Sequence, residues 1–409
     1  MQNIDYFQSK KGVFDQIISQ FGTPVFVTDK QVLKEKVLNI KNSFSEKCKL
    51  FYAMKANFNP SIINALKEFG LDGVETISPY EIQLAKKLGF KGDQILFTGN
   101  NSAEYELDFA KEEGVIVNIG SLNELRYFGN KYRKSELSIR INPGFGDGEF
   151  QEVITGGDES KFGIIHSKLD EVLQIINECE LKVIGLHCHL GSGLYKTDQF
   201  EKMIILIFDL TKHFQSIQFV DLGGGFGVRY YPDSTPVDLN LFSEIVEKYY
   251  MQYDLLKKND VKIIFEPGKY LVAESTFLLT KVTNVLSNKN IKIVGVDTGM
   301  NHIGRPALYD SYHHAINISK PVGESENVQI VGNICESTDI INKEIRIANP
   351  EVGDVLAILT AGAYCASMSN LYNLRPYATE VMLDMDKFSI IRKRMGFKET
   401  FNAMGYTEK

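Results

Sequence analysis

Residues 51–57 read FYAMKAN, an apolar run with one lysine, Lys55, near its end. The run predicts a buried strand that stops before Asn57–Pro60, a segment typical of a turn. A lysine at the end of such a strand loses part of the hydration of its ammonium group, which favours the neutral, nucleophilic amine. Such an amine can form a Schiff base with a carbonyl compound. The alternative is a structural lysine whose stem is buried and whose ammonium group reaches water.

Short apolar strands alternate with amphipathic helical stretches around this segment, from about residue 25 to 270. The eight strand candidates are the number that a closed (β/α)8 TIM barrel requires. A doubly wound open sheet is the alternative, but the regular units and the lack of a Rossmann fingerprint favour closure. Helices are expected at Ser61–Phe69, Pro79–Leu88 and Leu241–Lys257. The strand candidates are Leu50–Ala56, Gly73–Ile77, Ile95–Thr98, Val115–Gly120, Leu137–Asn142, Val183–Leu190, Phe219–Gly225 and Lys262–Gly268.

The rhythm changes after Tyr270, where strands follow one another with few helices between them. This pattern predicts a second, all-β domain of sandwich or barrel-like form, so the fold class is α/β plus all-β. The N-terminal arm has no place in the barrel and is expected to join the β domain. The predicted domains are therefore 25–270 for the barrel and 1–24 with 271–409 for the β domain. The strand candidates are Thr276–Leu286, Ile291–Val296, Val328–Asn333, Val355–Thr360, Glu380–Leu383 and Phe388–Arg392.

The composition fits a large protein with reduced thiols. Its 409 residues, 44% of them hydrophobic, can form the cores of about two domains. A net charge of -7 with dispersed basic residues gives no reason to expect nucleic acid as a partner. The five cysteines have no CxxC spacing, which argues against disulfides and a zinc cluster and favours the cytoplasm. No apolar run approaches membrane-spanning length and the N-terminus has no signal-peptide core, so we expect no membrane association.

Glycines follow the seventh and eighth predicted strands, in GGGFG at 223–227 and EPG at 266–268. Active sites of TIM barrels lie where the strands end, and the loops after strands 7 and 8 often bind phosphate. Glycine N–H groups can approach an anion closely, although tight turns explain most single glycine runs. Lys55 would lie at the same end of the barrel. The longest loop, Pro143–Phe162, contains five glycines and is expected to be functional or mobile.

Three ionisable side chains also lie near strand ends. Glu266 ends an apolar strand, where its burial is costly without a cationic partner. A protonated cofactor ring, or a lysine or arginine, could be that partner. His187 and His189 share one face of the sixth strand by the two-residue period. No other His/Cys cluster in the sequence supplies further zinc ligands, so we expect no metal. Two interpretations of these histidines remain: a ring that stacks on a flat cofactor, or a histidine of the protein core.

Three clusters of polar residues lie in the β domain. Arg305 occupies a predicted turn, where its guanidinium could bind a carboxylate. Cys335 and Glu336 place a thiol and a carboxylate in one loop, and Tyr372 follows the small-residue run 361–369. The alternatives are, in turn, a surface ion pair, a buried structural cysteine and an ordinary turn.

Together these segments closely resemble the fold-type III, alanine-racemase-like pyridoxal-phosphate decarboxylases, and within them the diaminopimelate decarboxylase family. The resemblance runs in order through nearly the whole chain. Its segments are FYAMKAN at 51–57, RINPGFG at 140–146, GGDESKFGI at 156–164, GLHCHLGSG at 185–193, LGGGFGV at 222–228, EPGKYLVA at 266–273, VDTGMNHIGRPALYDSYHH at 296–314, CESTDI at 335–340 and TAGAYCASMSNLYNLRP at 360–376.

The resemblance implies a site for pyridoxal 5'-phosphate. Lys55 would bind the cofactor covalently, His189 would stack on its ring and Glu266 would face its ring nitrogen. The residues implied to hold the phosphate are Ser192, Gly225, the turn Glu266–Gly268 and Tyr372.

The resemblance also implies the decarboxylation of an amino acid, meso-2,6-diaminopimelate, to L-lysine and CO2. The active sites would be shared across a head-to-tail homodimer, with Cys335 of the partner subunit protonating the α-carbon. A substrate without a distal carboxylate would leave the Arg305 guanidinium unpaired. The residues implied to bind the substrate are Lys269, Arg305, Tyr309, Glu336 and Tyr372.

Two residues depart from the family's usual sequence, and both concern substrate recognition. Lys269 stands where the family usually has a substrate-binding arginine, and it keeps the charge but loses the planar fork. Thr338 replaces the glycine of the usual CESGD loop. A related decarboxylase of D-ornithine/lysine or carboxynorspermidine therefore remains an alternative. A pyridoxal-phosphate-binding protein without turnover would resemble the barrel alone, and a racemase is disfavoured because the second domain resembles the decarboxylases.

Overall fold

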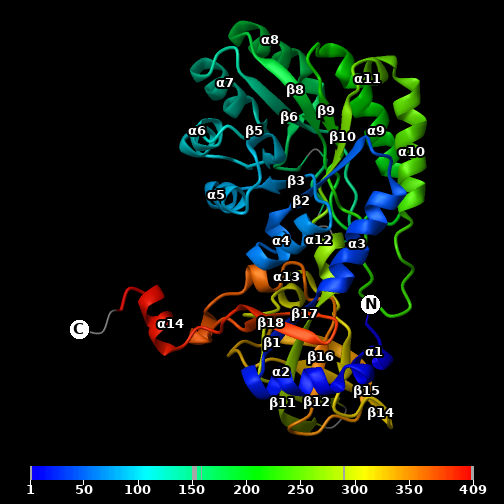
Figure 1. Cartoon of the computed structure of the whole chain (residues 1–409), viewed down its shortest axis with the longest axis vertical. Helices are drawn as coiled ribbons and strands as arrows, with labels where there is room; N and C mark the ends of the chain where they lie inside the picture. Colours follow the sequence, from blue (N-terminus) through cyan, green and yellow to red (C-terminus); the bar gives the residue numbers. More distant parts are fainter. Residues whose placement is uncertain (1, 150–153, 158, 289–290, 407–409) are drawn as a thin grey trace. The chain divides into compact units, whose positions relative to one another are not determined.

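The computed structural model describes residues 2–149, 154–157, 159–288 and 291–406 (Figure 1). They form two compact units. The barrel unit comprises Lys36–Gly227 and Pro236–Tyr270, and the β unit comprises Met1–Glu35, Val228–Thr235 and Leu271–Lys409. These units differ from the predicted division at residues 25–35 and 228–235, and the domain boundaries themselves stay a prediction.

The barrel unit is built on a closed ring of parallel strands, which confirms the predicted (β/α)8 barrel. In the described residues, eight strands pair in the order β5-β4-β3-β2-β10-β9-β8-β6, and β5 pairs with β6 to close the ring. The two-residue strand β7 (Ile164–Ile165) adds to β6 outside this ring. The ring strands are β2 (Cys48–Ala53), β3 (Gly73–Thr76), β4 (Ile95–Phe97), β5 (Ile116–Ile119), β6 (Glu136–Asn142), β8 (Lys182–His187), β9 (Phe219–Asp221) and β10 (Lys262–Phe265).

Helices surround the ring (Figure 1), and their sequences explain where they begin. The side chain of Asn59 accepts a hydrogen bond from the Ser61 N–H at 3.0 Å, and Pro60 opens the helix behind this cap. The predicted helix Leu241–Lys257 is two helices instead, because Tyr253 has an extended conformation. The helices are α4 (Pro60–Glu68), α5 (Pro79–Lys87), α6 (Glu104–Glu112), α7 (Leu122–Lys131), α8 (Leu169–Cys179), α9 (Asp198–Leu210), α10 (Leu239–Gln252) and α11 (Asp254–Lys258), together with α3 (Lys30–Ser43) and α12 (Lys269–Val272), which both cross the unit boundary.

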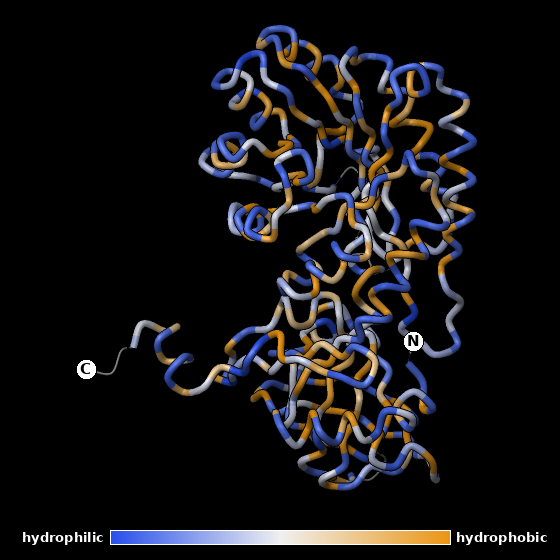
Figure 2. Tube along the Cα trace, viewed as in Figure 1, coloured by the Kyte–Doolittle hydropathy of each residue, from blue (hydrophilic) through white to orange (hydrophobic). Residues whose placement is uncertain are grey.

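The hydropathy of the trace follows this arrangement. In Figure 2 the barrel strands are mainly orange, whereas the outer helices carry both blue and orange. Strands covered on both faces are expected to be apolar throughout, and helices covered on one face are expected to be amphipathic. Across the described residues, no helix has both the length and the apolar character that a membrane span requires.

The β unit contains a mixed sheet. Its main strand order is β15-β14-β12-β11-β1-β17-β18, and β16 pairs with β11 and with β13. Strand β1 pairs with β11 on one side and with β17 on the other, so residues 25–29 belong to this sheet and not to the barrel as the sequence suggested. Strands β13 and β15 were not predicted from the sequence. The strands are β1 (Val25–Asp29), β11 (Thr276–Asn288), β12 (Ile291–Val296), β13 (Ala315–Asn317), β14 (Ser325–Val331), β15 (Ile340–Ala348), β16 (Val355–Ile358), β17 (Thr379–Asp384) and β18 (Lys387–Arg392).

The N-terminal arm packs on this sheet, as predicted. It forms α1 (Ile4–Ser9) and α2 (Lys11–Phe21), and the buried rings of Phe7 and Phe14 lie 5.0 and 5.5 Å from that of Phe277. The C-terminal part of the unit adds α13 (Arg305–Tyr309) and α14 (Phe397–Ala403).

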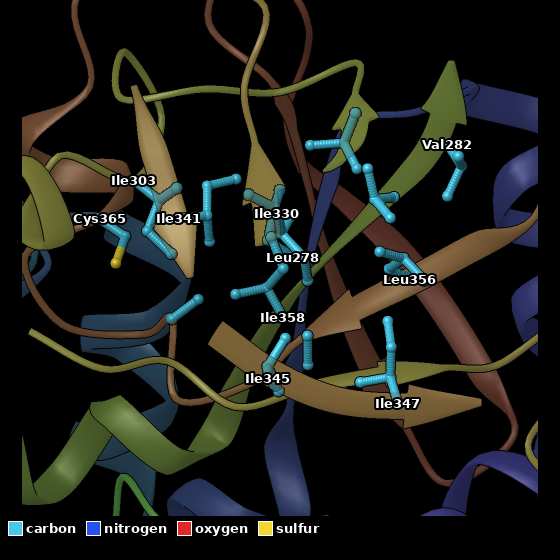
Figure 3. Close-up of a cluster of buried hydrophobic side chains, with 14 of the residues drawn as sticks. Leu278, Val282, Ile303, Ile330, Ile341, Ile345, Ile347, Leu356, Ile358 and Cys365 are labelled. Carbon is cyan, nitrogen blue, oxygen red and sulfur yellow. The ribbon is translucent and has the colours of Figure 1, made fainter. Parts of the chain in front are cut away.

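The sheet has a hydrophobic core on each face. Leu278 belongs to the cluster in Figure 3, together with Ile330 and Ile358. Its neighbours Phe277 and Leu279 belong to the other cluster, which the N-terminal helices cover. The two-residue period of β11 thus supplies both cores, as expected for a sandwich-like domain.

Buried His302 is expected to make the stability of the β unit depend on pH. Its Nε2 donates to the carbonyl of Pro376 at 2.9 Å, and its Nδ1 lies 3.0 Å from Thr298 Oγ1. Burial lowers the pKa of His302 to about 4. Because the unfolded chain takes up a proton at a higher pH, stability should fall as the pH drops from about 7 to about 4.

We expect His302→Gln to lose less stability over this range, by up to ~3 kcal/mol, because glutamine does not titrate. Denaturant unfolding of both proteins at several pH values checks this. Parallel pH profiles for the two proteins would contradict it.

Candidate active site

Lys55 lies at the C-terminal end of the barrel strands. Strand β2 ends at Ala53 rather than at the predicted Ala56, and a 3-10 turn, Met54–Ala56, carries the lysine. Its Nζ lies 2.9 and 3.0 Å from the two carboxylate oxygens of Glu75. The side chain of Lys55 is 38% exposed and that of Glu75 only 1%. Burial raises the pKa of Glu75 to about 7, although Lys55 opposes the shift. The amine thus contacts a buried carboxylate and is still accessible.

Glu266 directly follows β10 and joins a buried cluster. Its Oε2 lies 3.3 Å from His187 Nε2, and both side chains are buried. Burial raises the pKa of Glu266, but His187, Lys55 and Asp221 outweigh this and bring it to about 2. Burial, together with the charge of Glu266, raises the pKa of Asp221 well above its usual value. The geometry therefore favours an anionic Glu266 and a protonated Asp221.

One oxygen of Glu266 is available to a ligand. Oε1 is buried and has no hydrogen-bond partner within the described ranges. A buried carboxylate oxygen without a donor is costly, which points to a donor that a bound group supplies.

The glycine-rich loops after β8, β9 and β10 pack against one another. Gly225 has φ +92°, and its carbonyl accepts hydrogen bonds from the N–H groups of Gly193 and Leu194 at 2.9 and 2.8 Å. A Cβ on Gly225 would lie 2.2 Å from the Gly191 carbonyl, and one on Gly224 would lie 2.3 Å from that of Glu266. Only glycine fits these positions, so backbone lines this part of the site. Such a surface can bind a phosphate through N–H groups.

His189 lies beside these glycine loops. The His189 Nδ1 accepts a hydrogen bond from the Gly224 N–H at 3.3 Å. Burial lowers the pKa of His189 well below its usual value, so its ring is neutral. A neutral ring at this position can pack against a flat, apolar or positively charged ring.

Lys269 pairs with the longest loop. Its Nζ lies 3.2 Å from Glu149 Oε2, and its side chain is 5% exposed. The Glu149 N–H also donates to the Ser192 carbonyl at 2.8 Å, next to the glycine loops. Residues 150–153 and 158 of the predicted loop Pro143–Phe162 lie outside the described residues.

Sequence reasoning missed three charged residues of the barrel cluster. Glu75, Arg140 and Asp221 are all buried near the C-terminal ends of strands. The Arg140 guanidinium lies 4.7 Å from the centre of the Phe162 ring. Each of the three is a charged residue in an otherwise apolar barrel strand. This pattern is visible in the sequence and could have indicated a functional role for all three.

Arg305 is buried in the β unit. It begins the short helix α13, which Pro306 helps to start, so it is not in the predicted turn. It is only 2% exposed, which rules out the surface ion pair. Its Nη1 donates to the Tyr230 hydroxyl at 2.6 Å and lies 3.2 Å from His313 Nε2. Tyr309, at the end of the same helix, is half-buried.

Cys335, Glu336 and Tyr372 lie together on the surface of the β unit. Cys335 is exposed, which excludes a buried structural cysteine. Its N–H donates to Asn373 Oδ1 at 2.8 Å, and the hydroxyl of Tyr372 donates to the Glu336 carboxylate. Tyr372 is 45% exposed. The loop therefore offers a thiol, a phenol and a carboxylate to a ligand or to another chain.

The barrel residues fit pyridoxal 5'-phosphate. They supply an accessible amine on Lys55, a buried anionic carboxylate on Glu266 with one oxygen open, and backbone around Gly225 that suits a phosphate.

Comparison with known proteins agrees with this chemistry. Residues 30–273 match the family model of the pyridoxal-dependent decarboxylases, pyridoxal binding domain. The chain is 34% identical over 398 residues to the diaminopimelate decarboxylase of Methanothermobacter thermautotrophicus, covering 94% of this chain and 92% of that protein. The chain belongs to the diaminopimelate decarboxylase family. The diaminopimelate decarboxylase of Escherichia coli is 32% identical over 405 residues, 93% of each chain.

Solved structures of the diaminopimelate decarboxylase family share the fold. The enzyme of Helicobacter pylori complexed with L-lysine matches with a TM-score of 0.87 and 31% identity, covering 96% of this chain and 99% of that one. The lysine/ornithine decarboxylase of Vibrio vulnificus, complexed with putrescine, has a TM-score of 0.78 over 92% of this chain and 98% of that one. At 20% identity this second likeness concerns the fold alone.

Proposed function

We propose that this protein decarboxylates meso-2,6-diaminopimelate to L-lysine and CO2, the last step of lysine biosynthesis, with pyridoxal 5'-phosphate bound at Lys55. The observation that carries the proposal is the barrel cluster, in which the Lys55 amine and the open oxygen of Glu266 lie at the C-terminal end of the strands. The similarity over 94% of the chain to the diaminopimelate decarboxylase of Methanothermobacter thermautotrophicus supports the choice of substrate.

The barrel side chains have separate roles. Lys55 Nζ bonds the cofactor, and Glu75 holds the amine in position. Glu266 keeps the ring nitrogen protonated, and His189 packs on the ring face. When bound, pyridoxal phosphate accepts the electrons released as the bond between Cα and the carboxylate breaks.

The other residues of the proposed site bind the cofactor phosphate or the substrate. The loops after β8, β9 and β10 would hold the phosphate. The proposed phosphate contacts are Ser192, Gly225, Gly268 and Tyr372, and the proposed substrate contacts are Lys269, Arg305, Tyr309, Glu336 and Tyr372.

We propose a homodimer in which Cys335 of one chain serves the site of the other. The thiol is exposed and lies beside Glu336 and Tyr372, so a second subunit can reach it. Cys335 then donates its proton to the α-carbon after CO2 has left. We also propose that the protein works in the cytoplasm, because its five cysteines are free thiols.

The substrate assignment can be tested at Arg305. The guanidinium binds the distal carboxylate in this proposal, so Arg305→Gln should lower kcat/KM for meso-diaminopimelate by roughly 10²-fold. The exposed arginine Arg346 in β15 supplies the control, and Arg346→Gln should leave kcat/KM unchanged. An unchanged kcat/KM in Arg305→Gln, with the cofactor bound as in wild type, would contradict the assignment.

One observation favours a second candidate, a related decarboxylase of another amino acid such as D-ornithine, lysine or carboxynorspermidine. Lys269 stands where an arginine usually binds substrate, and it pairs with Glu149. A protein that acts on one of these compounds and not on meso-diaminopimelate would support this second candidate.

A further inference from the structure

Three ionisable side chains meet behind the open oxygen of Glu266. One ligand-type atom from each of His187, Asp221 and Glu266 lies within 4.8 Å of the other two, and all three residues are buried. They come from the ends of three neighbouring strands, β8, β9 and β10. The role proposed above uses Glu266 alone. The other two side chains form the layer behind it.

The hydrogen bonds of His187 determine where its proton lies. Its Nδ1 is 3.0 Å from the amide nitrogen of Asn118, which can only donate, so Nδ1 carries the lone pair. Burial lowers the pKa of His187, and the ring is neutral. Its one proton is therefore on Nε2, the atom 3.3 Å from Glu266 Oε2. The Nε2–H therefore lies close to the carboxylate, although Nε2, like Asp221 Oδ2 and Glu266 Oε1, makes no hydrogen bond of standard geometry within the described residues.

The second carboxyl group, that of Asp221, must also be neutral. Two carboxylates this close in a buried site cannot both be ionised, because nothing screens their repulsion. Asp221 Oδ1 accepts the Gly223 N–H at 2.8 Å, whereas Oδ2 has no hydrogen-bond partner within the described ranges. The proton therefore fits on Oδ2, the oxygen that is free to donate. Glu266 then keeps the single negative charge of the group.

The charges around the cluster agree with one anion at Glu266. Four further elements carry ionisable side chains that face the cluster: Lys55 and Arg140 are cationic, whereas Glu75 is an acid that pairs with Lys55. The groups facing the cluster are Lys55 after β2, Glu75 on β3, Arg140 on β6, and Cys188 and His189 after β8. Burial raises the pKa of Cys188 to about 12, so this thiol adds no charge.

We propose that His187 and Asp221, each as a neutral proton donor, hold Glu266 as a carboxylate and thereby set how tightly it keeps the proton on the cofactor ring nitrogen. Both are positioning residues, since they act through Glu266. This inference rests on the contact between Glu266 and the ring that the proposed function assigns.

The test compares variants that keep the donor with variants that remove it. Asp221→Asn and His187→Gln retain an N–H, whereas Asp221→Leu and His187→Leu do not. Each purified protein is loaded with pyridoxal phosphate, and two quantities are measured: the dissociation constant of the cofactor, and the pH at which its absorbance changes. Circular dichroism and thermal unfolding establish that each variant is folded.

We expect the donor-keeping variants to resemble wild type in both quantities. The leucine variants should bind the cofactor about 10-fold more weakly, the loss typical of one hydrogen bond to a charged group, and should lose the protonated ring at a lower pH. Asp221→Asn as impaired as Asp221→Leu would overturn the proposal, because it would make Asp221 the ionised group. Stoichiometric divalent metal in wild type, lost in Asp221→Asn, would also overturn it.

The outcomes separate this inference from the proposed function. Wild type that binds pyridoxal phosphate at Lys55 but releases no CO2 would contradict the function, and the titrations would still test the cluster. Wild type that releases CO2 with identical cofactor titrations in all four variants would contradict the cluster alone.

Discussion

Lys55→Ala is expected to abolish CO2 release from meso-diaminopimelate and the absorbance of covalently bound cofactor. Removing the residue that forms the covalent bond typically costs on the order of 10⁴-fold or more in kcat. The Lys55 amine lies 3.0 Å from a carboxylate, that of Glu75, which cannot form the Schiff base in its place. Absorbance spectroscopy and a CO2 assay of the purified variant measure both losses.

Lys49 provides a matched control for this variant. It lies on the same strand, β2, and its side chain is also 38% exposed, but it pairs with Asp72 before the strand reaches the active-site end. Lys49→Ala should keep both the cofactor absorbance and the rate. Undiminished turnover in Lys55→Ala, or an equal loss in Lys49→Ala, would refute the role of Lys55.

Cys335→Ala is expected to lower kcat by about 10³-fold while the cofactor absorbance stays as in wild type. The reason is that the thiol serves as a general acid, a role that usually contributes 10²- to 10⁴-fold, and it does not hold the cofactor in this proposal. The control is Cys48→Ala on the barrel strand β2, where burial raises the pKa of the thiol to about 12. This control should have wild-type kcat.

A mixing experiment tests whether Cys335 acts in the other subunit. Lys55→Ala and Cys335→Ala, each inactive, should together regain roughly a quarter of the wild-type rate. The reason is that half of all dimers are then mixed, and each mixed dimer carries one intact site out of two, made of both chains. No recovery after subunit exchange would mean that the thiol acts within its own chain or not at all.

The sequence was sufficient to predict the barrel because its signals are local. Eight apolar runs separated by helical patterns correspond to β2–β6 and β8–β10. The glycines that line the site follow directly after β9 and β10 in the sequence. The same applies to Lys55 and Glu266, since each ends its own apolar run. The predicted helix Leu241–Lys257 was wrong for an equally local reason. One residue in an extended conformation, Tyr253, divides it into α10 and α11.

Long-range pairing could not be predicted in the same way. Strand β1 reads like any strand at the start of an α/β unit, and only its hydrogen bonds to β11 and β17 assign it to the β unit. Likewise, the partners of Glu266 are 45 and 79 positions away at Asp221 and His187. A single sequence shows that each of these residues is charged or polar within an apolar strand, but not that they meet.

The most direct test of the account is CO2 release from the pyridoxal-phosphate-loaded protein, with meso-diaminopimelate, L-lysine, D-lysine, D-ornithine and carboxynorspermidine offered in parallel and Lys55→Ala as the blank. The account predicts turnover of meso-diaminopimelate, L-lysine as the product and no comparable release from the other four compounds. Turnover only of a compound without the distal carboxylate would contradict the substrate and the role of Arg305. A bound cofactor with no turnover of any compound would contradict the assignment as a decarboxylase.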